Sequence, residues 1–195
     1  MQWIVVVTLA LCLASQVQAQ EADGAEAAVV MPAALAGVDG GLAKRMQRDM
    51  GDVAADAMTL IMGYGTGGGI DRAGIETWLA VERAAARAVV MRRMVEADLN
   101  ADGTIAAAEI AVIAAAAEAG VRGRIMQNHA LADADGDGAV SAPEAAARAE
   151  VFAMERVSEG DAARAMVLMG LDMDGDGRLT LAEVNEATRL MAAGG

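Results

Sequence analysis

Residues 98–109 read DLNADGTIAAAE, residues 133–144 read DADGDGAVSAPE, and residues 172–183 read DMDGDGRLTLAE. The three stretches share one internal pattern. Positions one, three and five carry a side-chain oxygen, position six is Gly, position eight is aliphatic and position twelve is Glu. One such stretch could arise by chance in an Asp-rich chain, whereas three complete copies indicate a repeated structural unit.

The pattern suits a hard divalent cation, which takes six to eight oxygen ligands at about 2.3–2.6 Å. Positions one, three and five can aim three side chains at one point, Gly at position six permits the sharp turn, and Glu at position twelve closes the site. Position seven contributes only its backbone carbonyl. The predicted ligands are Asp98, Asn100, Asp102, Thr104 and Glu109; Asp133, Asp135, Asp137, Ala139 and Glu144; and Asp172, Asp174, Asp176, Arg178 and Glu183.

An alternative is that the acidic triplets are solvated turns that cap helices. That interpretation leaves the Gly, aliphatic and Glu positions unexplained, so we favour a metal loop. From about residue 42 to residue 191 the chain resembles the EF-hand family, with calmodulin-like spacing. The resemblance implies an all-α fold of two paired helix-loop-helix lobes and three calcium (Ca²⁺) sites. It also implies short antiparallel β bridges between loops, made by the position-eight residues Ile105, Val140 and Leu179.

A fourth repeat lies 35 residues before Asp98, where residues 63–74 read GYGTGGGIDRAG. Gly68 stands at the turn position and Ile70 at the aliphatic one, but glycines replace the acidic ligands and the closing Glu. The stretch could be a flexible glycine-rich linker. We favour a silent hand that binds no metal but pairs with loop 98–109, because the helical phase continues correctly beyond it.

The pattern divides the chain into four parts. Residues 1–19 are typical of a signal peptide cleaved after Ala19, which predicts a periplasmic or secreted protein, and the apolar run is short for a membrane anchor. Residues 20–40 are expected to form a disordered tether. Residues 41–120 would hold the silent loop paired with loop 98–109, and residues 121–195 would hold the other two loops. A helix is expected over 42–62, bent or split at Gly51.

Charge and composition exclude several functions. The net charge is −13, and eleven of the 28 acidic residues stand at the predicted ligand positions, so the acidity belongs largely to the metal loops. Such a chain will not bind nucleic acid by charge. Cys12 lies in the predicted signal peptide and His129 is the single histidine, expected to be packed. With no catalytic constellation, we predict that the protein is not an enzyme.

The leading hypothesis is an exported calcium-binding protein whose folding is completed by calcium. Eleven of the 14 methionines fall in expected helices. They can simply fill the core, or they can line a groove that opens on calcium binding and holds a partner protein, as in a calcium sensor. A weaker alternative is periplasmic handling of lanthanides, which are hard ions, or of copper(I) through Met91 and Met94. No stable membrane insertion is expected once the signal peptide is removed.

Overall fold

The computed structural model describes residues 31–194, so the predicted signal peptide and residues 20–30 of the tether lie outside the described residues. The chain is mostly helical, which confirms the all-α prediction. None of the described helices is both long and apolar enough to cross a membrane. The elements are, in order, the 3₁₀ helix η1 (Ala33–Leu35), α1 (Gly40–Arg48), α2 (Met50–Tyr64), β1 (Gly69–Ile70), α3 (Arg72–Ala97), β2 (Thr104–Ala106), α4 (Ala107–Ala115), α5 (Ala119–Ala132), β3 (Ala139–Ser141), α6 (Ala142–Arg156), α7 (Glu159–Val167), the 3₁₀ helix η2 (Leu168–Leu171), β4 (Leu179–Thr180) and α8 (Leu181–Gly194).

The segment 31–40 is ordered, so the prediction of a disordered tether is wrong for this part. Leu35 in η1 is 1% exposed and belongs to the main hydrophobic cluster. Its burial removes about as much apolar surface from water as any core leucine, which offsets the entropy of ordering a short segment. Met31 and Val38 also pack against this cluster, but three large apolar side chains within ten residues are too short a pattern to have predicted a packed segment.

The helix expected over 42–62 is split at Asp49 rather than at Gly51. Asp49 has φ −156° and ψ 89°, ends α1 through its backbone N–H, and caps α2 because its carboxylate accepts a hydrogen bond from the Asp52 amide. A capping aspartate satisfies an otherwise unpaired amide, so it ends and starts helices more effectively than a nearby glycine.

The loops pair in a nested order, which contradicts the expected pairing of consecutive loops. β2 pairs with β3, so loop 98–109 lies against loop 133–144, and β1 pairs with β4, so the glycine loop 63–74 lies against loop 172–183. Both bridges are antiparallel and place position eight opposite position eight, as Ile105 opposite Val140 and Ile70 opposite Leu179. The aliphatic bridge was therefore predicted correctly, while the partners were not.

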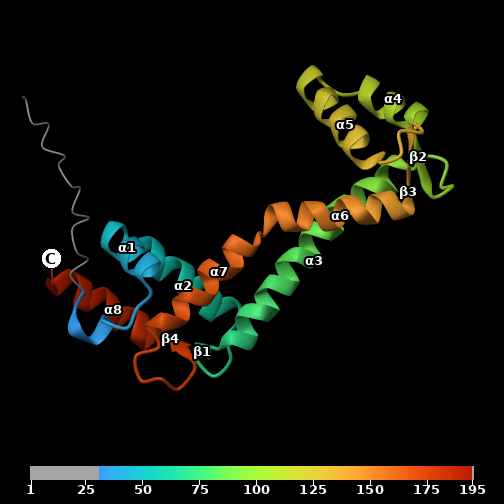
Figure 1. Ribbon diagram of the computed structural model, residues 1–195. Helices are drawn as coiled ribbons and strands as arrows, with labels where there is room; N and C mark the ends of the chain where they lie inside the picture. Colours follow the sequence, from blue (N-terminus) through green and yellow to red (C-terminus); the bar gives the residue numbers. More distant parts are fainter. Residues whose placement is uncertain (1–30, 195) are drawn as a thin grey trace, which may run out of the picture.

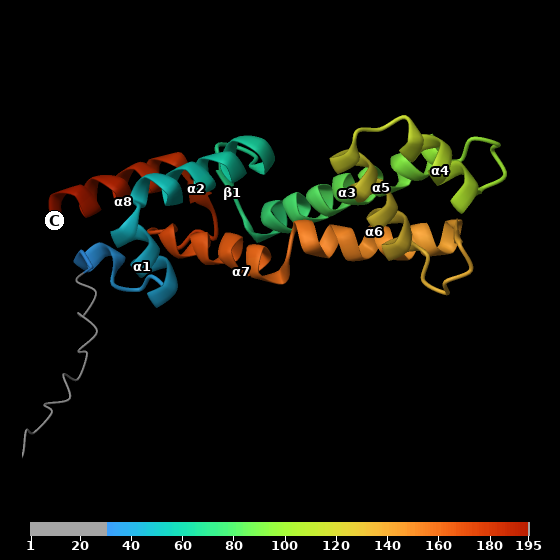
Figure 2. The same cartoon turned by 90° about the horizontal axis from the view of Figure 1, so that it is seen from above.

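The helices between the loops explain this order. α3 is continuous over 26 residues and so carries the chain about 39 Å away from loop 63–74. A short connection between α4 and α5 then reverses the chain, and α6 returns along α3 (Figures 1 and 2). The result is an elongated molecule with the β1–β4 lobe at one end and the β2–β3 lobe at the other.

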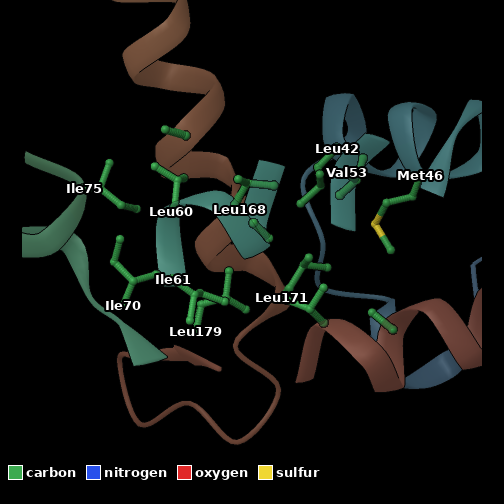
Figure 3. Packing of buried hydrophobic residues seen from close by; sticks show 14 of the residues in the cluster. Leu42, Met46, Val53, Leu60, Ile61, Ile70, Ile75, Leu168, Leu171 and Leu179 are labelled. Carbon is green, nitrogen blue, oxygen red and sulfur yellow. The ribbon is translucent and has the colours of Figure 1, made fainter. Parts of the chain in front are cut away.

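The two lobes have separate hydrophobic clusters of unequal size. In the β1–β4 lobe, Leu60, Ile70 and Ile75 pack with Leu168 and Leu179, which come from the opposite half of the chain (Figure 3). The N-terminal segment adds Leu35, Leu42 and Met46 to this cluster. The β2–β3 lobe has a smaller cluster, whose buried members are Met94, Ala97, Ile105, Ile110, Val140 and Ala145. Each cluster thus contains residues from both halves of the sequence.

Candidate metal centre

The three acidic loops share one backbone conformation. Gly103, Gly138 and Gly177 at position six have φ values of 86°, 89° and 84°. This left-handed conformation is easily adopted only by glycine, and it turns the chain back on itself. Position four also has positive φ in each loop, and in loop 98–109 this residue is Ala101 at 58°. The sequence pattern therefore encodes the same turn three times.

The turn gathers the predicted side chains at positions one, three and five. Carboxylate oxygens of Asp133, Asp135 and Asp137 lie within 4.8 Å of one another, and those of Asp172, Asp174 and Asp176 do the same. In loop 98–109 the position-three residue is an amide: Asn100 donates from Nδ2 to Asp102 Oδ2 at 2.8 Å, and the Asp102 amide donates to Asp98 Oδ1 at 3.1 Å. All three predicted triplets are brought together.

Backbone amides hold the position-one carboxylates in the same way in each loop. Oδ2 of Asp98, Asp133 and Asp172 accepts a hydrogen bond from the position-six glycine amide at 2.9, 3.0 and 2.8 Å respectively. The amide of position seven likewise donates to the position-five carboxylate in all three loops, at 2.8–2.9 Å. These bonds fix the orientation of two carboxylates and leave other oxygen lone pairs available for a ligand.

The closing glutamates lie against the start of their own loops. Glu109, Glu144 and Glu183 each accept hydrogen bonds from the amides of positions two, three and nine, the shortest at 2.7 or 2.8 Å. The hydroxyls of Ser141 and Thr180 also donate to the closing carboxylate, whereas Ala106 in the first loop cannot. Each glutamate is thus held beside the acidic residues it would join in binding an ion.

Hydrogen bonding keeps several of these carboxylates ionised. The backbone amide and hydroxyl of Ser141, with the Ala134 amide, lower the pKa of Glu144 to about 2. Hydrogen bonds from Thr104 lower the pKa of Asp102. For Glu183, burial raises the pKa, but the hydrogen bonds from Thr180 and Met173 outweigh it and the net change is a lowering. Ionised carboxylates are the form that binds metal, so these groups need no deprotonation at neutral pH.

The glycine loop 63–74 repeats the turn without the ligands. Gly68 has φ 85°, matching position six of the acidic loops, and Ile70 lies in the β bridge. The loop is therefore a structured turn and not the flexible linker of the alternative interpretation. The sequence pattern predicted only that Arg178, in the opposite loop, contributes its backbone carbonyl as a metal ligand. Its guanidinium in fact donates hydrogen bonds to the carbonyl oxygens of Thr66 and Gly69.

A groove lies in the β2–β3 lobe, beside the paired acidic loops. It encloses about 550 Å³ between the end of α3, α4, α5 and the start of α6. The lining is mostly Ile, Val and Ala, and its one methionine is Met94, so a Met-lined groove is not what this lobe has. His129 is half-buried at the groove, with Nε2 3.2 Å from the Ile105 carbonyl oxygen, as a packed histidine should be.

Comparisons with known proteins identified no relative of this chain. Protein-family models, curated proteins and solved structures were all searched, and none matched the chain significantly.

Proposed function

We propose that this protein is a calcium-binding protein with three EF-hand loops, 98–109, 133–144 and 172–183. The observation that carries the proposal is the repetition, in three separate loops, of one arrangement of oxygen donors around one glycine turn. The side chains at positions one, three, five and twelve are all carboxylates apart from one amide, and such oxygen ligands suit hard cations better than they suit copper or zinc. Loop 63–74 would be the silent member of the family pattern.

Calcium fits the donor set better than magnesium does. Magnesium demands near-ideal octahedral geometry and gives up its water reluctantly, whereas calcium accepts six to eight oxygens in flexible geometry. A loop that offers three side chains, one backbone carbonyl and a bidentate glutamate provides such a set. Lanthanide ions are hard enough to enter the same loops, but no feature of the described residues favours them over calcium.

Calcium would also complete the fold. Loops 133–144 and 172–183 each hold four carboxylates in a small volume, and their mutual repulsion destabilises the compact state. An ion that binds only the folded form adds its binding free energy to the free energy of unfolding. We further propose that the protein acts outside the cytoplasm, where EF-hand modules work with Kd values of about 10⁻⁴–10⁻³ M.

Calorimetric titration of the chain from residue 20 onward tests the proposal. Calcium is expected to bind at three sites per chain, and magnesium in equal concentration should displace little of it. The same titration with copper(I) and with a lanthanide ion is the comparison. Fewer than two calcium ions per chain, or tighter binding of copper(I), would contradict the proposal.

A second candidate function is a calcium sensor that holds a partner protein in the β2–β3 groove. The specific observation is that this lobe is open: α5 has no buried residue, and Val121 is 40% exposed at the groove. The β1–β4 lobe, in contrast, has its apolar residues covered by the segment that carries Leu35, Leu42 and Met46. Nothing in the described residues covers the β2–β3 lobe in the same way.

The charges at the groove indicate which partner would fit. Arg93 and Arg124 line it, and neither forms an ion pair within residues 31–194. Arg148 lines it too, but its guanidinium bonds Glu155, and the acidic residue of the lining, Glu96, pairs with Arg92. Two unpaired cations beside an apolar surface favour an amphipathic helix with aliphatic residues on one face and acidic residues on the other. If the protein is a calcium sensor, we propose that its partner is an acidic amphipathic helix of this kind.

Two synthetic helices of equal apolar face, one with Glu and one with Lys on the polar face, test this choice. We expect the Glu helix to bind at least about tenfold more tightly in calcium, since like charges oppose the Lys helix. The double substitution Arg93→Glu with Arg124→Glu should reverse the preference. Arg156→Glu, an exposed arginine outside the groove, is the control. Equal binding of both helices, or self-association of the chain in their place, would contradict an acidic partner.

A further inference from the structure

We propose that Arg178 is a tethered cation that takes the place of a metal ion in the glycine loop 63–74. The loop has the turn of the acidic loops but no carboxylate at positions one, three, five or twelve. Its backbone carbonyls remain, and the Arg178 guanidinium binds two of them. Carbonyl oxygens that converge in a turn attract a positive charge, whether it is an ion or a fixed side chain.

One of the two carbonyls that Arg178 contacts stands at a loop position where a calcium loop binds its ion. Gly69 is position seven of loop 63–74, the position whose carbonyl binds the ion in a calcium loop. Arg178 Nη2 donates to this oxygen at 3.0 Å and also donates to the Thr66 carbonyl. Arg178 Nη1 lies 3.9 Å from a carboxylate oxygen of Asp71, at position nine. An arginine stays charged at any physiological pH and carries five donors, so one side chain can serve all three groups.

The pairing of β1 with β4 positions Arg178 beside loop 63–74. The register puts Ile70 opposite Leu179, so Arg178 lies directly across from Asp71. Gly69 allows the two strands to approach closely, because a Cβ there would lie only 3.1 Å from the Leu179 carbonyl oxygen. The Arg178 side chain is 33% exposed, as expected of a group held between two loops.

The placement of the cation is selective. Position seven is Thr104 in loop 98–109 and Ala139 in loop 133–144, and both of those loops face a partner that has its own carboxylates. The one arginine at position seven stands opposite the one loop without ligands. This correspondence distinguishes a replacement for the ion from an ordinary surface arginine.

Arg178 also joins the silent loop to the third acidic loop. Its backbone amide donates to Asp176 Oδ1 at 2.8 Å, and its backbone carbonyl is a predicted metal ligand. Side chain and backbone of one residue therefore act on two loops. Loss of the guanidinium should loosen loop 63–74 and, through the shared residue, weaken ion binding at loop 172–183. This second effect rests on the proposed calcium binding, whereas the first does not.

Amide relaxation of the metal-free chain tests the first effect alone. We compare Arg178→Met, which removes the cation and keeps the aliphatic stem, with Arg178→Lys, which keeps a point charge. In the native chain the amides of Gly65–Gly69 should have order parameters of about 0.85, and in Arg178→Met they should fall below about 0.6. Arg178→Lys should lie between the two. The amides of Thr104–Ala106 should not change in either variant.

Arg189→Met is the matched control, because Arg189 is exposed on α8 of the same lobe and pairs only with Glu186. Unchanged order parameters in Arg178→Met would overturn the proposal, as would identical behaviour of the Lys and Met variants. If Arg178→Met does not fold, Arg178→Lys decides: order parameters of Gly65–Gly69 that stay above about 0.6 with lysine support a cation role, and values below this oppose it. Calcium titration of the same variants then measures the coupling to the third loop, expected as an about tenfold weaker third site.

Discussion

Replacing Glu183 by glutamine should reduce calcium binding from three ions to two and remove the calcium stabilisation of the whole β1–β4 lobe. Glutamine keeps the size of the side chain but loses the negative charge that closes the site. The lobe has no second site, because the loop paired with 172–183 is the glycine loop. At a calcium concentration of 100 Kd the lost stabilisation is about 2.7 kcal/mol.

The chain provides a reporter for this lobe. Trp78 is half-buried against its hydrophobic cluster, and the other tryptophan, Trp3, lies in the predicted signal peptide. Thermal unfolding followed by Trp78 fluorescence should therefore lose its calcium dependence in Glu183→Gln. Glu144→Gln should also remove one ion, yet should leave the Trp78 transition dependent on calcium, since that site lies in the other lobe.

Glu186→Gln is the matched control on the same helix. Its carboxylate pairs with Arg189 at the surface, so its loss should change the stability little and should not reduce the number of bound calcium ions. Three ions bound by Glu183→Gln would refute the ligand assignment. An equal loss of the Trp78 calcium response in Glu144→Gln would refute the separation of the two lobes.

The conformation of the acidic loops could be predicted from the sequence because each loop is specified by residues that are close together in the chain. Twelve consecutive residues specify the turn through one glycine, the grouping of the oxygen-bearing side chains through their spacing, and the bridge through one aliphatic residue, so no distant contact is needed. The amides that hold the closing glutamates follow from the same local geometry. The glycine turn at Gly68 and the bridge residue Ile70 could be found in the same way, by extending the repeat.

The pairing of loops is not a local property, and the sequence prediction of consecutive pairs was wrong. Two features decide it: α3 continues without interruption from Arg72 to Ala97, and the chain reverses between α4 and α5. The first could have been suspected, because no Gly or Pro follows Gly74 before Gly103. The second lies in an Ala-rich stretch that carries no strong turn signal. The contacts of Leu35 and of the Arg178 guanidinium are equally non-local.

Cutting the chain between residues 117 and 118 should give two halves that fold only together. In the expected consecutive pairing each half would hold a complete pair of loops, whereas in the nested order each half holds one loop of both pairs. The second half supplies six buried residues to the main cluster, of which the four largest are Leu168, Leu171, Leu179 and Val184. Their burial contributes on the order of 6–12 kcal/mol, comparable with the whole stability of a small domain.

We therefore expect little helical circular dichroism from residues 31–117 or from residues 118–194 alone in calcium, and recovery of the intact spectrum on mixing them in equal amounts. Leu171→Ala in the second half should weaken the association by about 2–5 kcal/mol, because Leu171 is fully buried. Leu131→Ala, at a side chain 56% exposed, should leave it unchanged. Two halves that each fold and bind calcium independently would show that neighbouring loops pair instead. The nested order predicts the opposite because each hydrophobic cluster takes buried residues from both halves.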